Sequence, residues 1–256
     1  MRLPFQFRKF WRLIFFSTLV FFNPAHAVVG RPVAAIDLGH LPKSPGAISA
    51  RGITEYSFNK NMAARIAREL NRINVVDAIL INPDGISIGL ADRTALAKKM
   101  NAEFFLSVHH DSVQSKYLKT WRYNAVDRVY SDNFSGYSLF YSERNQFARS
   151  SFRAAELIGE QLRRDGFIPT AHHAEAIQGE NRPFIDPFRG IYKFDDLVVL
   201  RTAPMPAVLV ECGIILNRTE EKHLSNPAYQ NKLARAIAIG LSNFVKELYT
   251  EKTWEK

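Results

Sequence analysis

Cysteine is almost absent from this chain, since Cys212 is the only one. An intrachain disulfide is therefore excluded, and the fold has to be stabilised by its hydrophobic core. The chain has 256 residues, of which 46% are hydrophobic, which is enough for a sizeable core in one domain. It contains no internal repeat, no low-complexity tract and no obvious interdomain linker.

Long apolar runs are also scarce. Beyond residue 27, no stretch reaches the roughly 18 apolar residues that a membrane-spanning helix needs. The N-terminus has a basic segment, a short apolar run over residues 13–22 and then Ala25-His26-Ala27. This pattern predicts a secretory signal peptide over residues 1–27, with an uncleaved membrane anchor as the alternative. We therefore expect an exported protein of the periplasm or cell envelope, with no stable membrane span after signal cleavage.

No block of lysine and arginine with interleaved aromatic residues is present, which argues against nucleic acid as a partner. The formal net charge is +9, and the N-terminal 27 residues contribute +4 of it through Arg2, Arg8, Lys9 and Arg12. The remaining residues, 28–256, therefore carry +5. A basic balance of this size suits an anionic polymer or surface.

Apolar strand patterns and amphipathic helix patterns alternate along residues 28–256. We expect strands near residues 33–38, 75–81, 104–108, 136–141, 197–201 and 207–211, and helices near residues 56–73, 90–100, 146–165 and 227–249. This order predicts a single α/β domain with a mostly parallel sheet. Two segments, near residues 116–133 and 170–189, lack a clear period, and we expect them to be loops or small helical insertions.

Histidines follow two of the predicted strands. His40 follows the first, and His109 and His110 follow the third, while Glu55 lies where a loop meets the next helix. Ligands of open α/β sheets bind beyond the carboxyl ends of the strands, so these side chains are expected at one rim. Two histidines and a glutamate with one open position are typical of a catalytic zinc site. Because strand side chains alternate, His109 and His110 should point to opposite faces, and parity alone does not say which one binds.

Glu211 ends another apolar strand, where an unpaired carboxylate is costly. It is interpreted either as a salt-bridge partner or as a general base with a raised pKa. Asp37 is a candidate for orienting His40 through a hydrogen bond. Arg93 is expected to support the same edge of the sheet. His172 and His173 are expected to be solvated, with contact to substrate as the alternative. Glu175, Glu180 and Asp186 are expected to be loop charges, and Cys212 is expected to be a small buried residue.

Several motifs in this order resemble the catalytic domain of zinc-dependent N-acetylmuramoyl-L-alanine amidases. They are Asp37-Leu-Gly-His40, Pro45-Gly-Ala47, Glu55, Arg93, Phe105-Leu-Ser-Val-His109, Pro206-Ala-Val-Leu-Val-Glu211-Cys-Gly213 and the closing segment over residues 217–240. The resemblance implies a three-layer fold, a twisted sheet with helices on both faces, and one Zn²⁺ per chain. It also implies that His40, Glu55 and His109 hold the zinc and that Glu211 is the catalytic glutamate, which leaves His110 beside the metal rather than on it.

The chain departs from the family pattern at the rim. Leu41 and Pro42 replace the usual glycines, Ser44 stands where an aspartate is common, and His110-Asp111 replaces a small residue and an asparagine. These changes bear on substrate detail more than on the metal. In some relatives an insertion occludes the site until an activator protein binds, and the segments near 116–133 and 170–189 are candidates for such insertions.

The resemblance predicts a cell-wall hydrolase that acts on peptidoglycan. It would cleave the amide between the lactyl group of N-acetylmuramic acid and the L-alanine of the stem peptide, using water activated by zinc. Two alternatives remain at this point: a catalytically inactive wall-binding regulator, or a zinc peptidase with another exported substrate.

Overall fold

The computed structural model describes residues 30–254, with side chains as far as Thr250. The predicted signal peptide lies outside the described residues. A seven-stranded sheet forms the centre of the domain, with strands in the order β2-β1-β3-β9-β6-β8-β7. The strands are β1 (Val33–Leu38), β2 (Asp77–Ile81), β3 (Phe104–Asp111), β6 (Ser138–Tyr141), β7 (Phe184–Asp186), β8 (Ile191–Lys193) and β9 (Ala207–Ile214).

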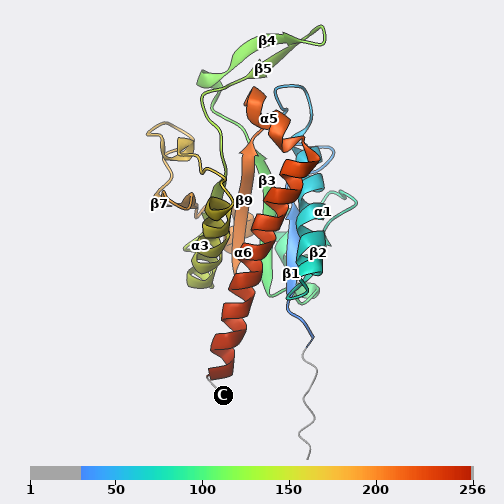
Figure 1. The fold of residues 1–256 in the computed structure, drawn as a ribbon, viewed down its shortest axis with the longest axis vertical. Coiled ribbons are helices and arrows are strands. Elements are labelled where there is room, and N and C mark those ends of the chain that lie inside the picture. The colour runs from blue at the N-terminus through green and yellow to red at the C-terminus, as the bar shows by residue number, and fades with distance from the viewer. Residues whose placement is uncertain (1–29, 255–256) are drawn as a thin grey trace, which may run out of the picture. The chain divides into compact units, whose positions relative to one another are not determined.

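The sheet is mostly parallel, as predicted. Four of its pairings are parallel, and only β6 with β9 and β7 with β8 are antiparallel. The longer helices are α1 (Glu55–Ile73), α2 (Leu90–Lys99), α3 (Ala148–Arg164) and α6 (Pro227–Trp254), and two short ones are α4 (Val198–Thr202) and α5 (Arg218–Leu224). Figure 1 shows α1, α3 and α6 together on one face of the sheet.

Alternate strand residues build a core on each face of the sheet. Leu106 and Val208 pack with α1, α3 and α6, whereas Phe105 and Leu209 pack with α2 and α4 on the other face. This alternation follows from the pleat of the strands. The predicted three-layer α/β architecture is therefore confirmed.

Capping residues set both ends of the helix α1. The Thr54 side chain accepts a hydrogen bond from the backbone N–H of Ser57 and so satisfies a free donor of the first turn. Asn74 ends the helix in the left-handed conformation, with φ of 64°. This start positions Glu55 as the first residue of the helix, at the carboxyl end of β1.

Residues 198–202 form the helix α4, so the strand predicted near 197–201 was wrong. A short apolar run does not by its periodicity distinguish a strand from a buried helical turn. Here the Asn145 side chain donates to the backbone carbonyls of Leu200, Ala203 and Met205, which satisfies acceptors at the end of the turn. That tertiary contact was not visible in the sequence.

The segment near residues 116–133 is a β-hairpin rather than a loop. Strands β4 (Lys119–Tyr123) and β5 (Val126–Tyr130) pair antiparallel through a two-residue turn, Asn124-Ala125, with both φ angles positive. This is the backbone pattern of tight hairpin turns, although the alanine replaces the usual glycine. Figure 1 shows the hairpin beyond the carboxyl ends of β3 and β9.

The segment near residues 170–189 contains a 3-10 turn, η2 (His172–Ala174), and the edge strand β7. A second 3-10 turn, η1 (Ser115–Tyr117), precedes the hairpin. Within residues 30–254, no helix is long and apolar enough to cross a membrane.

Candidate metal centre

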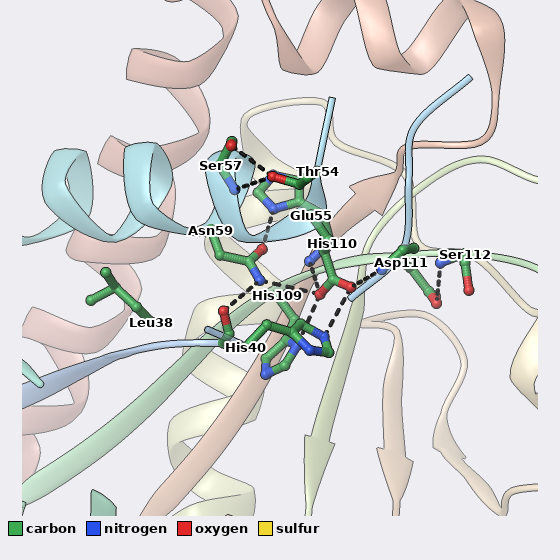
Figure 2. A network of polar contacts seen from close by, with 12 residues as sticks. Leu38, His40, Thr54, Glu55, Ser57, Asn59, His109, His110, Asp111 and Ser112 are labelled. Carbon is green, nitrogen blue, oxygen red and sulfur yellow. Dashed lines mark hydrogen bonds and ion pairs between the residues drawn. The ribbon is translucent and has the colours of Figure 1, made fainter. Parts of the chain in front are cut away.

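Three of the predicted site residues converge at the carboxyl ends of β1 and β3. The ligand atoms of His40, Glu55 and His109 all lie within 4.8 Å of one another. Nε2 of His40 lies 2.9 Å from Oε2 of Glu55, and Nδ1 of His109 lies 3.0 Å from Oε1 of the same carboxylate. Figure 2 shows both imidazole rings pointing at the Glu55 carboxylate.

Hydrogen-bond donors fix the Glu55 carboxylate. The backbone N–H of Ala47 donates to Oε2 at 3.1 Å, and Asn59 Nδ2 donates to Oε1 at 3.1 Å. Burial alone would raise the pKa of Glu55, but hydrogen bonds and positive charge from His109 and His40 outweigh it and hold the pKa well below its usual range. Glu55 is therefore an anion, which is the form that binds a metal ion.

Glycines make the close approach of these three side chains feasible. A Cβ atom at Gly46 would collide with Glu55 Oε2 and the His40 ring, and one at Gly39 would collide with the His109 ring. Gly46 also has a φ of 74°, which favours glycine. The absence of a side chain at Gly39 and Gly46 therefore leaves room for the three ligand residues. Their imidazole nitrogens and carboxylate oxygens are ligand types that suit zinc.

His40 is held by contacts to its backbone. Its own φ of 66° lies in the left-handed region, which is uncommon for residues other than glycine. Nη2 of Arg93 donates to the His40 carbonyl at 2.8 Å, and Nη1 of Arg93 donates to Asp37 at 2.8 Å. Asp37 also accepts from the Ser107 hydroxyl at 2.9 Å. The buried pair of Asp37 and Arg93 therefore braces the turn that presents His40, rather than contacting its ring.

His110 points away from His109, as strand alternation requires. It is 2% exposed, its ring lies against Phe58, and its Nδ1 lies 2.8 Å from the Asn59 side-chain oxygen. Burial, with a smaller contribution from the His109 charge, lowers the pKa of His110 to about 3, although Glu55 and Asp111 partly oppose this. His110 is therefore neutral in the folded protein and supports Asn59 beneath Glu55.

Glu211 lies on β9, directly across from His109 in the strand register. Its Oε2 is buried and has no hydrogen-bond partner among the described residues, so the salt-bridge interpretation is not supported. Burial raises the pKa of Glu211 well above its usual value, and the nearby Asp111 and Glu55 charges add to this effect. A carboxyl group in this environment is suited to taking and returning a proton.

A cavity of about 300 Å³ opens beside His40 and His109. Its lining includes apolar side chains at Ile88, Leu90 and Leu197, together with the rim residues Leu41 and Ser44. Two rim positions that depart from the family pattern, Leu41 and Ser44, therefore form part of the wall of a cavity that His40 and His109 also line.

The sequence profile of the N-acetylmuramoyl-L-alanine amidase family matches residues 34–243, most of the chain. The chain belongs to this family. A putative N-acetylmuramoyl-L-alanine amidase of Buchnera aphidicola subsp. Acyrthosiphon pisum is 28% identical over 240 residues, which cover 85% of this chain and 96% of the relative. The amidase AmiA of Escherichia coli (strain K12) is 26% identical over 254 residues, which cover 89% of this chain and 81% of AmiA.

Solved amidase structures share the fold. AmiC2 of Nostoc punctiforme matches with a TM-score of 0.62 at 25% identity, over 85% of this chain and 98% of that one. The CwlD amidase of Clostridioides difficile, solved in complex with the GerS lipoprotein, has a TM-score of 0.62 at 22% identity, over 85% of this chain and 100% of that one.

Some polar residues of this amidase were missed or misread in the sequence. Asn59, which bridges Glu55 and His110, had no recognisable signal beyond its helical spacing of four from Glu55. The expectation that His172 and His173 are solvated was wrong, since they are 2% and 7% exposed. The adjacency of the two histidines was the only sequence signal that they share an environment.

Because buried His110 is neutral, the unfolding free energy of the protein should depend on pH in a predictable way. The folded-state pKa of about 3 lies below the usual 6.5, so the folded protein binds fewer protons than the unfolded chain between these values. The His110 contribution to stability is therefore fully present above pH 6.5 and is lost as the pH falls. We expect wild type to lose about 2 kcal/mol more unfolding free energy than His110→Gln between pH 7 and pH 5.

Denaturant unfolding of both proteins at each pH measures this difference. The Gln side chain keeps a donor for the Asn59 oxygen, and protonation of the other histidines is common to both proteins. Parallel stability curves for wild type and variant would show that His110 is not held neutral by burial.

Proposed function

We propose that the chain is an exported zinc-dependent amidase in which His40, Glu55 and His109 hold the metal and Glu211 moves the proton. The family reaction is hydrolysis of the amide between the N-acetylmuramic acid lactyl group and L-alanine in peptidoglycan. The convergence of the three ligand atoms within 4.8 Å, with Glu211 across from His109, is the observation that carries this assignment.

A zinc ion bound by these residues would supply a Lewis acid for the amide carbonyl and lower the pKa of water. Glu211 then takes a proton from the attacking water and delivers it to the departing L-alanine nitrogen. The carbon–nitrogen bond breaks, the water oxygen stays on the lactyl carbonyl carbon, and the products are a lactyl carboxylate and a free amine. The buried Glu211 Oε2 has no hydrogen-bond partner within residues 30–254, which supports this role because no competing hydrogen bond there has to be broken.

The ligands need to be held in place while this proton moves. Arg93 and Asp37 fix the backbone of His40, and Asn59 and Ala47 fix the carboxylate of Glu55. The adjacent cavity provides space for substrate groups that flank the amide, with Leu41 and Ser44 at its wall. We infer that these two residues adjust which stem-peptide or glycan groups are accepted.

Digestion of purified sacculi followed by product mass analysis tests the proposed function. We expect stem peptides with a free L-alanine amine and glycan carrying a free lactyl carboxyl, and the reaction should stop on chelation and resume with added zinc. Fragments cleaved within the stem peptide would instead identify a zinc peptidase. No release under any condition would favour a wall-binding regulator.

Regulation by a partner is a second part of the proposal, since CwlD was solved with a lipoprotein bound. An activator would be needed only if one of the two insertions covered the metal centre, and the hairpin is the first candidate for such an insertion. The hairpin instead contacts the loop before α1 and the start of α5: Trp121 donates to the Ala50 carbonyl at 3.0 Å, and the Arg218 guanidinium lies 3.8 Å from the Tyr130 ring centroid.

These contacts lead to a prediction about the hairpin. No hairpin residue lines the cavity beside His40 and His109. We therefore expect that replacing residues 119–130 with a short Gly-Ser linker leaves the rate of sacculus digestion within about twofold of wild type, or lowers it because the Trp121 contact to the loop is lost. A severalfold increase in rate would identify the hairpin as an inhibitory lid.

A further inference from the structure

A second group of metal-binding side chains lies where η2 meets the end of β3. Asp111, His172 and His173 each offer one ligand atom, and these atoms lie within 4.8 Å of one another. Nε2 of His172 lies 3.2 Å from Oδ2 of Asp111, and Nε2 of His173 lies 2.8 Å from the same oxygen. None of these residues belongs to the His40, Glu55 and His109 group.

The three ligand atoms are buried and face one another without well-formed hydrogen bonds. Among residues 30–254, Asp111 Oδ2, His172 Nε2 and His173 Nε2 form no hydrogen bond of acceptable geometry, although both ring nitrogens lie within ion-pair distance of the carboxylate oxygen. Unsatisfied buried polar atoms are costly, and three at one point call for an explanation. A cation between them would satisfy all three together. Ligands about 2.0–2.2 Å from a tetrahedral zinc lie roughly 3.3 Å apart, near the 3.2 Å seen between His172 and Asp111.

The other ring nitrogen of each histidine is already engaged. His173 Nδ1 lies 2.8 Å from Oε2 of Glu180, and His172 Nδ1 lies 3.0 Å from Oγ1 of Thr170. When Nδ1 carries the proton and donates it to such an acceptor, the Nε2 lone pair is free to bind a metal ion. A carboxylate that accepts from the second ring nitrogen, as Glu180 does for His173, is typical of metal-bound histidines.

The surroundings of the cluster exclude water and fix its position. The His172 ring lies beside Phe134, and the His173 ring lies beside Phe140 and Tyr192. Asp111 is held at the strand end, where its carbonyl accepts from the N–H of Ile215 and its Oδ1 accepts from the N–H of Ser112. An apolar shell around a small polar cluster is a further property of metal sites in proteins.

We propose that Asp111, His172 and His173 form a second site for a divalent transition-metal ion, zinc being the ion tested first. The ion ties the segment that follows Thr170 to the end of β3. Glu180, which also accepts from Gln114 at 2.8 Å, acts as the partner that orients His173. The amidase would then carry two metal ions, one at each of two sites linked through residues 109–111 of β3.

Protons could supply the positive charge in place of a metal ion. Burial by itself would lower the pKa of His173, but Asp111 and Glu180 outweigh burial and raise the pKa to about 9 in the metal-free protein. An imidazolium at His173 would then pair with both carboxylates. The two possibilities differ in metal content, which is directly measurable.

The test is metal analysis of the full-length protein after loading with zinc and removal of loosely bound ions. We expect two equivalents in wild type, one in His173→Ala, one in His40→Ala and none in the double variant. His223→Ala, at an exposed histidine on α5, is the matched control and should keep two equivalents. A single equivalent in wild type that His173→Ala retains, or two equivalents in His173→Ala, would overturn the second site. A His40→Ala protein that keeps both ions would instead overturn the first site.

Two further measurements keep the test valid if the His173→Ala protein does not fold. Asp111→Asn keeps the shape of the side chain and its acceptor for Ser112, and it should also lose one equivalent. Titration of the unmodified metal-free protein with Co²⁺, followed by visible absorption, should saturate at two equivalents. Saturation at one equivalent, with that equivalent lost in His40→Ala, would show that protons rather than a second metal neutralise the cluster.

Discussion

Replacing Glu211 with Gln should lower kcat for sacculus digestion by about 10²- to 10⁴-fold, the range that a general base contributes. Gln has nearly the same shape but cannot accept and return a proton. Glu211 is placed for that role by its register opposite His109 and by burial of an oxygen that has no hydrogen-bond partner among the described residues. Because the proposed metal ligands are untouched, zinc content should equal that of wild type.

Release of stem peptides by the variant, measured with zinc analysis of the same sample, checks this result. Glu143→Gln is the matched control, because that side chain is exposed and pairs with Lys193 away from the ligands. It should keep activity within about twofold of wild type. A Glu211→Gln protein that digests at the wild-type rate would remove Glu211 from the mechanism, whereas loss of both activity and zinc would make it a residue that supports the metal.

Replacing His40 with Ala should weaken zinc binding at the first site by more than about 100-fold. Loss of residues that merely orient metal ligands already costs about 10- to 100-fold in affinity, and His40 is proposed as a ligand itself. The variant should therefore lose one zinc equivalent and sacculus digestion together. Its unfolding free energy should also fall, by about 2.7 kcal/mol at a zinc concentration 100 times the wild-type Kd.

Backbone strain needs a separate control at this position. His40 has a φ of 66°, where alanine adds strain of its own. Asn tolerates the left-handed region, so His40→Asn separates ligand loss from strain. Isothermal titration with zinc should show one weakened site in both variants. Zinc binding unchanged from wild type in His40→Asn would mean that His40 is not a ligand.

Much of the fold could be predicted because periodicity reports burial. The stripe of Phe58, Met62, Ile66 and Leu70 predicted α1, and all four side chains are at most 4% exposed. The apolar runs around Ile36 and Leu106 likewise predicted central strands buried on both faces. Elements whose stability depends on tertiary contacts were missed, such as α4, which the Asn145 side chain supports, and the hairpin with an unusual Asn124-Ala125 turn.

Some residues of the candidate site could likewise be predicted from the sequence, and others could not. His40 and His109 could be predicted to lie at one rim, because each follows a predicted strand and the carboxyl ends of parallel strands lie at the same edge of a sheet. The choice between His109 and His110 came from resemblance to the amidase family, and the structure shows His109 beside Glu55. The cluster of Asp111, His172 and His173 could not be predicted, because it joins residues about 60 positions apart through a segment with no periodic pattern.

The most direct test of the central claim is anomalous scattering at the zinc edge from crystals of the zinc-loaded protein. A peak should lie among His40 Nε2, the Glu55 carboxylate and His109 Nδ1, at about 2.0–2.2 Å from each ligand atom. The Glu211 carboxyl group should face the open position of that ion. Absence of a peak among these three residues, with zinc present in the crystal, would contradict the proposed catalytic centre.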